Sequence, residues 1–143
     1  MKSQYFSTIA GALAIAGAVF GVNAGTANAD SLDQFVTPSG NIGCLIGPQG
    51  ATCQIREFSY VQPQRPGNCH GNYGDVFGVE PAVPGRITCH TDAPIDFHSR
   101  TVDYGHQVRQ GNIVCTVSMR YVECVDATSG HGFRVAREFY AVY

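Results

Sequence analysis

Apolar and polar residues alternate along two stretches of the chain, and this period of two residues predicts β-strands that bury one face. In the first stretch the alternating apolar positions are Ile42, Cys44, Ile46, Ala51, Cys53 and Ile55. They share one face if the chain reverses direction at residues 48 and 49. The pattern therefore predicts an antiparallel hairpin in which Cys44 lies opposite Cys53.

The second stretch repeats the first. The run Gly40-Asn41-Ile42-Gly43-Cys44 precedes Cys53, the run Gly111-Asn112-Ile113-Val114-Cys115 precedes Cys124, and eight residues separate the two cysteines in each case. A reversal at residues 119 and 120 places one apolar set on a single face: Ile113, Cys115, Val117, Val122 and Cys124. The sequence thus predicts one structural unit, a C-x8-C hairpin, used twice.

The hairpin register also predicts how the cysteines pair. Counting outward from a two-residue turn, both cysteine pairs fall on non-hydrogen-bonded positions, where Cα atoms are about 4.5 Å apart. A disulfide spans about 4.4 to 6.8 Å between Cα atoms. We therefore expect Cys44 to bond Cys53 and Cys115 to bond Cys124, which leaves Cys69 with Cys89 by elimination. Neither tip has the Asn-Gly or Gly-x chemistry of a tight primed turn, so a longer loop stays open at each tip.

The rest of the chain predicts further short strands and little helix. Strand-like segments are residues 35–46, 51–58, 76–79, 86–89, 101–104, 107–109 and 133–137, and Pro81-Ala82-Val83-Pro84-Gly85 supplies the turn of a third hairpin. Residues 61–68 and 126–132 are rich in turn residues and are expected as surface loops. About eight to ten short strands favour an all-β fold, a small disulfide-stapled sandwich or barrel of antiparallel strands.

Residues 1–29 have the features of a secretory signal peptide. Lys2 precedes the apolar stretch 9–22, and Ala27-Asn28-Ala29 is the small-x-small pattern of a cleavage site. The apolar stretch is shorter than the roughly 20 residues that a membrane-spanning helix needs. We expect one disulfide-bonded domain at residues 30–143 that is secreted, either extracellular or associated with the cell envelope, with no membrane insertion after cleavage.

Charge narrows the classes of partner. Only 14% of the residues are charged, the net charge is −2, and all eleven acidic residues follow residue 29. Removal of Lys2 with the leader makes the mature chain more acidic still. A chain of this kind without a basic run is a poor nucleic-acid binder, so the expected partner is a protein or a glycan.

The cysteines also leave a zinc site to be weighed against disulfides. Cys69-His70 and Cys89-His90 set two kinds of zinc ligand side by side twice. Structural zinc sites favour Cys-x-x-Cys spacing, which this chain lacks, and an exported protein meets an oxidising environment. We expect six oxidised cysteines, no metal and no cofactor.

His131 lies in the most site-like local grouping of the chain. It stands between two glycines, with Ser129 before it and Arg137 after it, and an imidazole in such a loop contacts ligands or acts as a general base. The more economical interpretation is that the glycines supply turn geometry. His131 and Arg137 are the candidate ligand contacts, and no nucleophile, phosphate loop or metal-binding motif assigns a catalytic residue. Five tyrosines offer either binding surface or core: Tyr60, Tyr73, Tyr121, Tyr140 and Tyr143.

Motifs along residues 35–140 resemble those of a family of small secreted actinobacterial proteins, of the mycobacterial type, whose function is uncharacterised. The resemblance rests on Phe35-x-Thr37-Pro38-Ser39-Gly40-Asn41-Ile42-Gly43-Cys44, Cys53-x-Ile55, Tyr104-Gly105, the span from Cys115 to Cys124, Ser129-Gly130-His131-Gly132-Phe133 and Arg137-Glu138-x-Tyr140. It implies an exported, disulfide-bonded domain, and it carries no activity to transfer.

These observations predict a secreted, non-enzymatic binding or structural module. One alternative is a secreted proteinase inhibitor, because Pro and Gly bracket residues 79–86 and the bond between Arg86 and Ile87 is a conceivable scissile bond. The other alternative is a small secreted hydrolase that uses His131.

Overall fold

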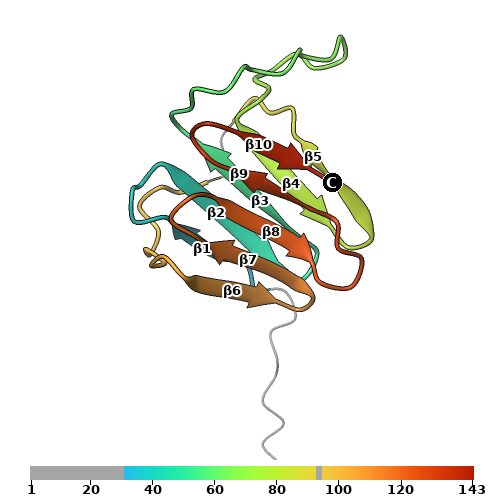
Figure 1. The fold of residues 1–143 in the computed structure, drawn as a ribbon. Coiled ribbons are helices and arrows are strands. Elements are labelled where there is room, and N and C mark those ends of the chain that lie inside the picture. The colour runs from blue at the N-terminus through green and yellow to red at the C-terminus, as the bar shows by residue number, and fades with distance from the viewer. Residues whose placement is uncertain (1–30, 93–94) are drawn as a thin grey trace, which may run out of the picture.

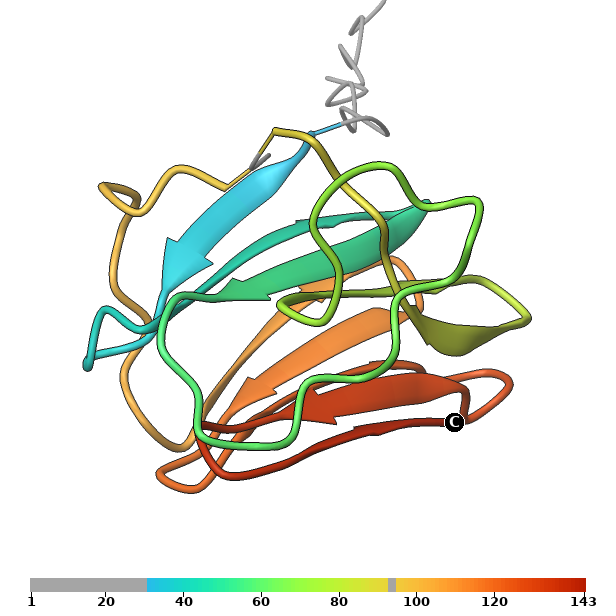
Figure 2. The same cartoon turned by 90° about the horizontal axis from the view of Figure 1, so that it is seen from above.

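The computed structural model describes residues 31–92 and 95–143, which form ten β-strands in two five-stranded antiparallel sheets (Figure 1). Within those residues there is no helix, and so none that could span a membrane. The predicted signal peptide at residues 1–29 lies outside the described residues. The all-β prediction is confirmed, with the sheets packed face to face as two layers (Figure 2).

Each sheet is a meander in which sequential strands are neighbours. Sheet 1 contains β1 (Asp33–Val36), β2 (Ile42–Gly47), β3 (Gly50–Ile55), β4 (Val76–Glu80) and β5 (Val83–Ile87) in that order. Sheet 2 contains β6 (His106–Gln110), β7 (Ile113–Val117), β8 (Val122–Asp126), β9 (Gly132–Val135) and β10 (Tyr140–Val142). The internal repeat therefore extends beyond the hairpin: β2–β3 and β7–β8 are the centres of two five-strand units.

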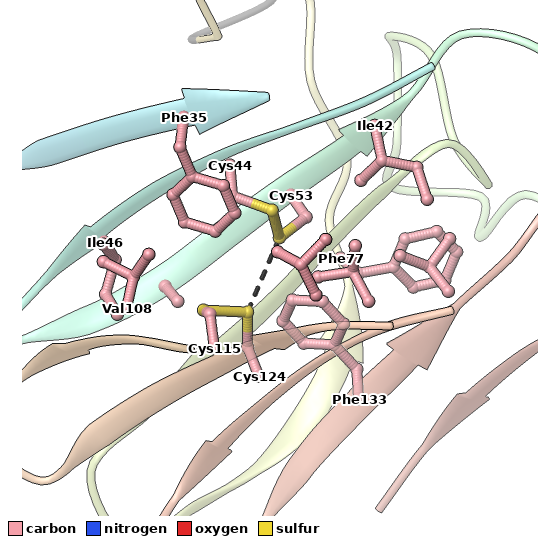
Figure 3. Close-up of a cluster of buried hydrophobic side chains, with 14 of the residues drawn as sticks. Phe35, Ile42, Cys44, Ile46, Cys53, Phe77, Val108, Cys115, Cys124 and Phe133 are labelled. Atoms are coloured by element: carbon pink, nitrogen blue, oxygen red, sulfur yellow. Dashed lines mark hydrogen bonds between the residues drawn. A yellow bond between two sulfur atoms is a disulfide. The ribbon is translucent and has the colours of Figure 1, made fainter. Parts of the chain in front are cut away.

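The core lies between the sheets and is built around two disulfides. Phe35, Phe77 and Phe133 are fully buried there. Cys53 Sγ in sheet 1 lies 3.6 Å from Cys124 Sγ in sheet 2 (Figure 3). Because both sulfurs are oxidised they carry no proton, and this approach is a packing contact between the two bridges.

All three bridges join the predicted partners. The Cα atoms of Cys44 and Cys53 are 4.1 Å apart and those of Cys115 and Cys124 are 4.0 Å apart, the close spacing of non-hydrogen-bonded pairs. The third bridge joins Cys69 to Cys89. All six cysteines are disulfide-bonded, so Cys69 and Cys89 offer no free thiolate to a zinc ion. The same holds for the close-packed buried group Cys44, Cys53 and Cys124.

The two predicted hairpins differ at their tips. In the first, Gly47 pairs with Gly50, so the turn has two residues as predicted. In the second, the strands stop at Val117 and Val122, which leaves a four-residue tip. There the Ser118 hydroxyl donates to the Tyr121 carbonyl at 2.7 Å and accepts from the Tyr121 amide at 3.1 Å. The Ser118 hydroxyl thus takes the place of a backbone group in the hydrogen bonding between the two strands.

Several predicted strand boundaries were wrong. Residues 35–46 break at a turn after Val36, and residues 101–104 form only an isolated parallel bridge from Thr101 to Val36. The predicted 133–137 strand ends at Val135, because the amide of Ala136 donates to the carbonyl of Phe139 in a turn that leads into the unpredicted β10. The third hairpin is tighter than predicted, with Pro81 and Ala82 alone between its strands.

The sheets also meet along one side through the chain's last residue. The Tyr143 carbonyl accepts hydrogen bonds from Gly85 of β5 and Gly132 of β9, both at 2.8 Å. A Cβ on Gly85 would lie 1.8 Å from the carbonyl oxygen of Gly132, so only glycine fits there. Backbone contact thus partly closes the sandwich on this side.

Candidate functional site

Loops of both sheets gather at one end of the sandwich, at the left in Figure 1. They line a pocket of about 530 Å³. We call it the end pocket. Its lining residues come from the β1–β2 turn, the end of β3, the approach to β6 and the β7–β8 and β9–β10 turns: Thr37, Ser39, Gly40, Asn41, Ile42, Arg56, Glu57, Tyr104, Ser118, Met119, Arg120, Tyr121, Val122, Ala136, Arg137 and Glu138.

The Thr-Pro-Ser-Gly-Asn motif builds one wall of the end pocket. Thr37 is buried, and its amide donates to the carbonyl of Ile42 at 2.9 Å. The amide of Gly40 donates back to Thr37 at 2.8 Å, with Gly40 in the left-handed region at φ 69°. Ser39 lies 3.0 Å from the Thr37 hydroxyl. The motif is therefore a closed turn whose polar groups bond mostly to one another.

Asn41 fastens this turn to the residues that follow β3. Its side-chain amide donates to the Glu57 carbonyl at 2.8 Å, and its side-chain oxygen accepts from the Glu57 amide at 2.8 Å. The backbone carbonyl of Asn41 also accepts from Arg56 at 3.0 Å. This two-point contact imitates a strand pair and holds Arg56 and Glu57 against the pocket.

The β7–β8 tip forms the opposite wall. The Ser118 bonds hold the tip in shape, and Met119 projects from it with 84% of its surface exposed. Arg120 beside it is exposed as well. Tyr121 contributes its ring, which packs edge-on against Phe139 and lies under the Arg134 guanidinium. The tip therefore offers a thioether, a guanidinium and an aromatic ring on an ordered backbone.

An ion pair joins the two sheets across the pocket. Arg137, after β9, pairs with Glu57, after β3, and the backbone carbonyl of Arg137 accepts from the Ser59 amide at 2.7 Å. Arg56 lies over the Phe97 ring at 5.0 Å from its centroid. Within residues 31–92 and 95–143, neither Arg56 nor Arg120 forms an ion pair. Two arginines among the lining residues therefore have no acidic partner within the described part of the chain.

The structure separates His131 from Arg137. Arg137 lines the end pocket, whereas His131 precedes β9 and lies at the other end of the sandwich. The four residues of β9 set them about 13 Å apart along the strand. The structure therefore keeps Ser129 and His131 together but places Arg137 in a different part of the molecule.

The loop around His131 is organised by Asp126 instead. The Asp126 carboxylate accepts from the Ser129 hydroxyl at 2.7 Å, from the Thr128 amide at 3.1 Å and from the Ala82 amide of sheet 1 at 2.9 Å. These bonds, led by that from Ala82, lower the pKa of Asp126 to about 2. Gly130 takes φ 80°, in keeping with the turn interpretation of the glycines.

A second polar cluster lies beside the Cys69–Cys89 bridge. His90 Nε2 lies 2.8 Å from Asp75 Oδ1, and the Gln54 amide donates to Asp75 Oδ2 at 3.2 Å. His90 Nδ1 and Gln54 Oε1 are buried without a partner among the described residues. Among the described residues, no hydroxyl or thiol is hydrogen-bonded to this His–Asp pair, so the pair lacks the third member of a catalytic triad there.

The tyrosines divide between core and surface. Tyr60 and Tyr140 pack on the core, and burial raises the pKa of the Tyr60 phenol, which donates to the Gly74 carbonyl at 2.6 Å. Tyr121 lines the end pocket together with Tyr104, which sequence reasoning did not select. It also missed Arg56, Met119 and Arg120. The Thr-Pro-Ser-Gly-Asn motif and the tip of the second hairpin were both visible in the sequence. Only the fold shows that they lie at the same pocket.

Comparison with known proteins gives a family without a function. A family model described as "Family of unknown function (DUF6636)" matches residues 13–143. No curated protein and no solved structure matches the chain.

Proposed function

The chain belongs to DUF6636, a family of unknown function, and we propose that it is a secreted, non-enzymatic binding module that takes its ligand in the end pocket. The observation that carries this proposal is the meeting of the Thr-Pro-Ser-Gly-Asn turn with the β7–β8 and β9–β10 turns around one polar hollow. Binding residues are commonly placed on loops that a rigid scaffold positions.

The chemistry of the pocket supports binding over catalysis. Its lining residues include no histidine, cysteine or aspartate. The serine and threonine hydroxyls near the β1–β2 turn bond to one another and to backbone, and among the described residues neither glutamate of the pocket, Glu57 or Glu138, is hydrogen-bonded to them. Guanidiniums, amides and tyrosine rings are instead the groups with which proteins recognise polar ligands.

These groups fit a glycan or a segment of a protein. Arg56 and Arg120 supply charged donors, Tyr104 and Tyr121 supply aromatic surface, and Met119 supplies a flexible apolar contact. The loops are held in place by the two hydrogen bonds between the Asn41 side chain and the Glu57 backbone and by the ion pair of Arg137. Little conformational entropy is therefore lost when a ligand binds.

The two alternative functions receive less support. Arg86 lies within β5, where it pairs with Gly78 and contacts Glu80, whereas a proteinase inhibitor presents its scissile bond on a protruding loop. His131 is separated from the end pocket and lies in a loop organised by Asp126. Neither residue has the surroundings that its proposed role requires.

Export is part of the proposal. Three disulfides in a domain of this size favour an oxidising compartment, and the described residues contain no helix that could span a membrane. The features of residues 1–29 and the motifs resembling secreted actinobacterial proteins support the same location, in the extracellular space or at the cell envelope. Mass determination of the N-terminus of the protein recovered from culture medium tests cleavage after Ala29.

A paired-tip experiment tests the binding site. The purified protein is screened against arrays of envelope glycans and of secreted proteins, and each hit is measured by calorimetry. Replacement of the pocket tip, Met119→Ala with Arg120→Ala, is expected to weaken binding at least tenfold. The matched control is Pro48→Ala with Gln49→Ala at the equivalent tip of the first hairpin, at the far end of the sandwich, which is expected to change affinity less than twofold.

Two outcomes contradict the proposal. Equal losses in the two tip variants would place the ligand elsewhere. Turnover of a bound compound by the wild-type protein would show that the module is an enzyme.

A further inference from the structure

The edges of the two sheets are protected to different degrees. The outer edge of β1 is covered, because Val36 bonds to Arg100 at 2.9 Å and to Val102 at 3.0 Å. The β5 edge contains Pro84, which lacks an amide hydrogen, and Gly85, whose amide already bonds to Tyr143. The β10 edge has three residues. Coverage, proline and shortness are the usual means of preventing pairing at an edge.

Strand β6 lacks all three protections. It has five residues, His106–Gln110, without proline or lysine, and no other described strand pairs with its outer side. An open hollow of about 430 Å³ runs beside it, lined by residues 100–103 and 106–109. Strand β6 thus leaves one edge of sheet 2 accessible.

The disulfide fixes which backbone groups face outward. Cys115 and Cys124 form a non-hydrogen-bonded pair, so the backbone groups of Cys115 point toward β6, where its partner is Val108. Because the direction alternates along a strand, the N–H and C=O groups of Gln107 and Arg109 point away from β7. Among the described residues, no backbone partner reaches them.

This edge is complementary to itself. Two antiparallel β6 strands centred on Val108 place Gln107 of each copy opposite Arg109 of the other, and both residues have outward backbone groups. The pairing forms four backbone hydrogen bonds, two for each Gln107–Arg109 pair. Val108 meets its own equivalent on the core face, where it is already buried. Gln107 and Arg109 meet on the outer face without opposing like charges.

We propose that β6 is a dimerisation edge, through which a second copy of this chain pairs antiparallel to form a continuous ten-stranded sheet. The centre on Val108 is favoured because a shift that set Arg109 opposite Arg109 would oppose two cations. No lining residue of the end pocket lies within β6, although Tyr104 of the pocket precedes the strand by two residues.

Charge substitutions at Gln107 test the proposal by sedimentation velocity up to about 1 mM protein. The wild-type chain is expected to dimerise below that concentration. Gln107→Glu creates two Glu–Arg cross-strand pairs and is expected to tighten the dimer about fivefold, while Gln107→Arg creates two Arg–Arg pairs and is expected to weaken it by about the same factor. Gln64→Glu and Gln64→Arg, at an exposed position in the loop between β3 and β4, are matched controls expected to leave the dimer unchanged.

Hydrogen exchange locates the contact. The amides of Gln107 and Arg109 are expected to become protected as the dimer forms. Monomeric wild-type and Gln107→Glu proteins at the highest concentration would overturn the proposal. A dimer that forms without protection of these amides, or with equal affinity in both Gln107 variants, would overturn it as well.

Discussion

We predict that replacing cysteines by serine or by alanine lowers the free energy of unfolding by different amounts at the Cys115–Cys124 and Cys69–Cys89 disulfides. The test compares Cys115→Ala/Cys124→Ala with Cys115→Ser/Cys124→Ser, and makes the same two changes at Cys69 and Cys89. Cys115 and Cys124 are fully buried, whereas Cys89 is exposed. The difference between the serine and alanine variants at one site isolates the effect of the hydroxyls, because the constraint lost from the unfolded chain is the same.

The structure gives the magnitudes. With sequence separations of 9 and 20, the chain-entropy estimate assigns about 2.7 kcal/mol to the Cys115–Cys124 bridge and about 3.3 kcal/mol to the Cys69–Cys89 bridge. Two serine hydroxyls buried between the sheets can bond to each other, which leaves one O–H without a partner and adds about 1 to 3 kcal/mol at residues 115 and 124. At residue 69 the carbonyls of Gly71 and Asn72 lie 3.8 Å from the sulfur and can accept from a serine. There we expect the serine and alanine variants to differ by less than about 1 kcal/mol.

The measurement is the free energy of unfolding in urea, followed by circular dichroism and tyrosine fluorescence because the chain has no tryptophan. The result that refutes the reasoning is an equal difference between serine and alanine variants at the two sites. It would mean that the space between the sheets admits water to a buried hydroxyl, contrary to the dry packing of the two bridges.

Three further predictions concern turns and close contacts. The pKa of Asp126 is lowered from 3.8 to about 2, so its carboxylate contributes stability above pH 4 that is lost as the pH falls toward 2. When the urea midpoint is plotted against pH, the Asp126→Asn variant should show a flatter curve over this range. Ala82 has φ 60°, so Ala82→Gly should raise the free energy of unfolding by up to about 1 kcal/mol, whereas Ala127→Gly, at an exposed position without positive φ, should not raise it. Gly85→Ala should cost at least about 2 kcal/mol in chemical denaturation because of the Gly132 carbonyl, and Gly67→Ala, which has open space, less than about 0.5 kcal/mol.

Local patterns in the sequence determined the covalent framework and the class of fold. Alternation around Cys44 and Cys115 has a period of two, and only one register of each hairpin puts the apolar side chains and the cysteines on the same face. That register also sets the distance between Cα atoms, so the disulfide pairing followed without tertiary information. The matching repeats indicated a duplicated unit, although only its central hairpin was visible.

Strand boundaries depended on contacts that local patterns do not encode. Residues 101–104 have strand-like composition, but their neighbour is β1 of the other sheet, so they form a single bridge. The final residues pair as β10 because a turn after Val135 returns them to β9. Tertiary context decided both.

The candidate site depended on tertiary structure almost entirely. Neighbourhood in sequence brought Ser129, His131 and Arg137 together, yet a strand runs straight for its whole length and carries its two ends apart. Conversely, Asn41, Arg120 and Arg137 are far apart in sequence and meet because turns at the same end of two packed sheets converge. The sequence by itself determined how the two cysteine hairpins pair and which cysteines bond, since these features are local and periodic. The packing of one sheet on the other decided which loops share a pocket.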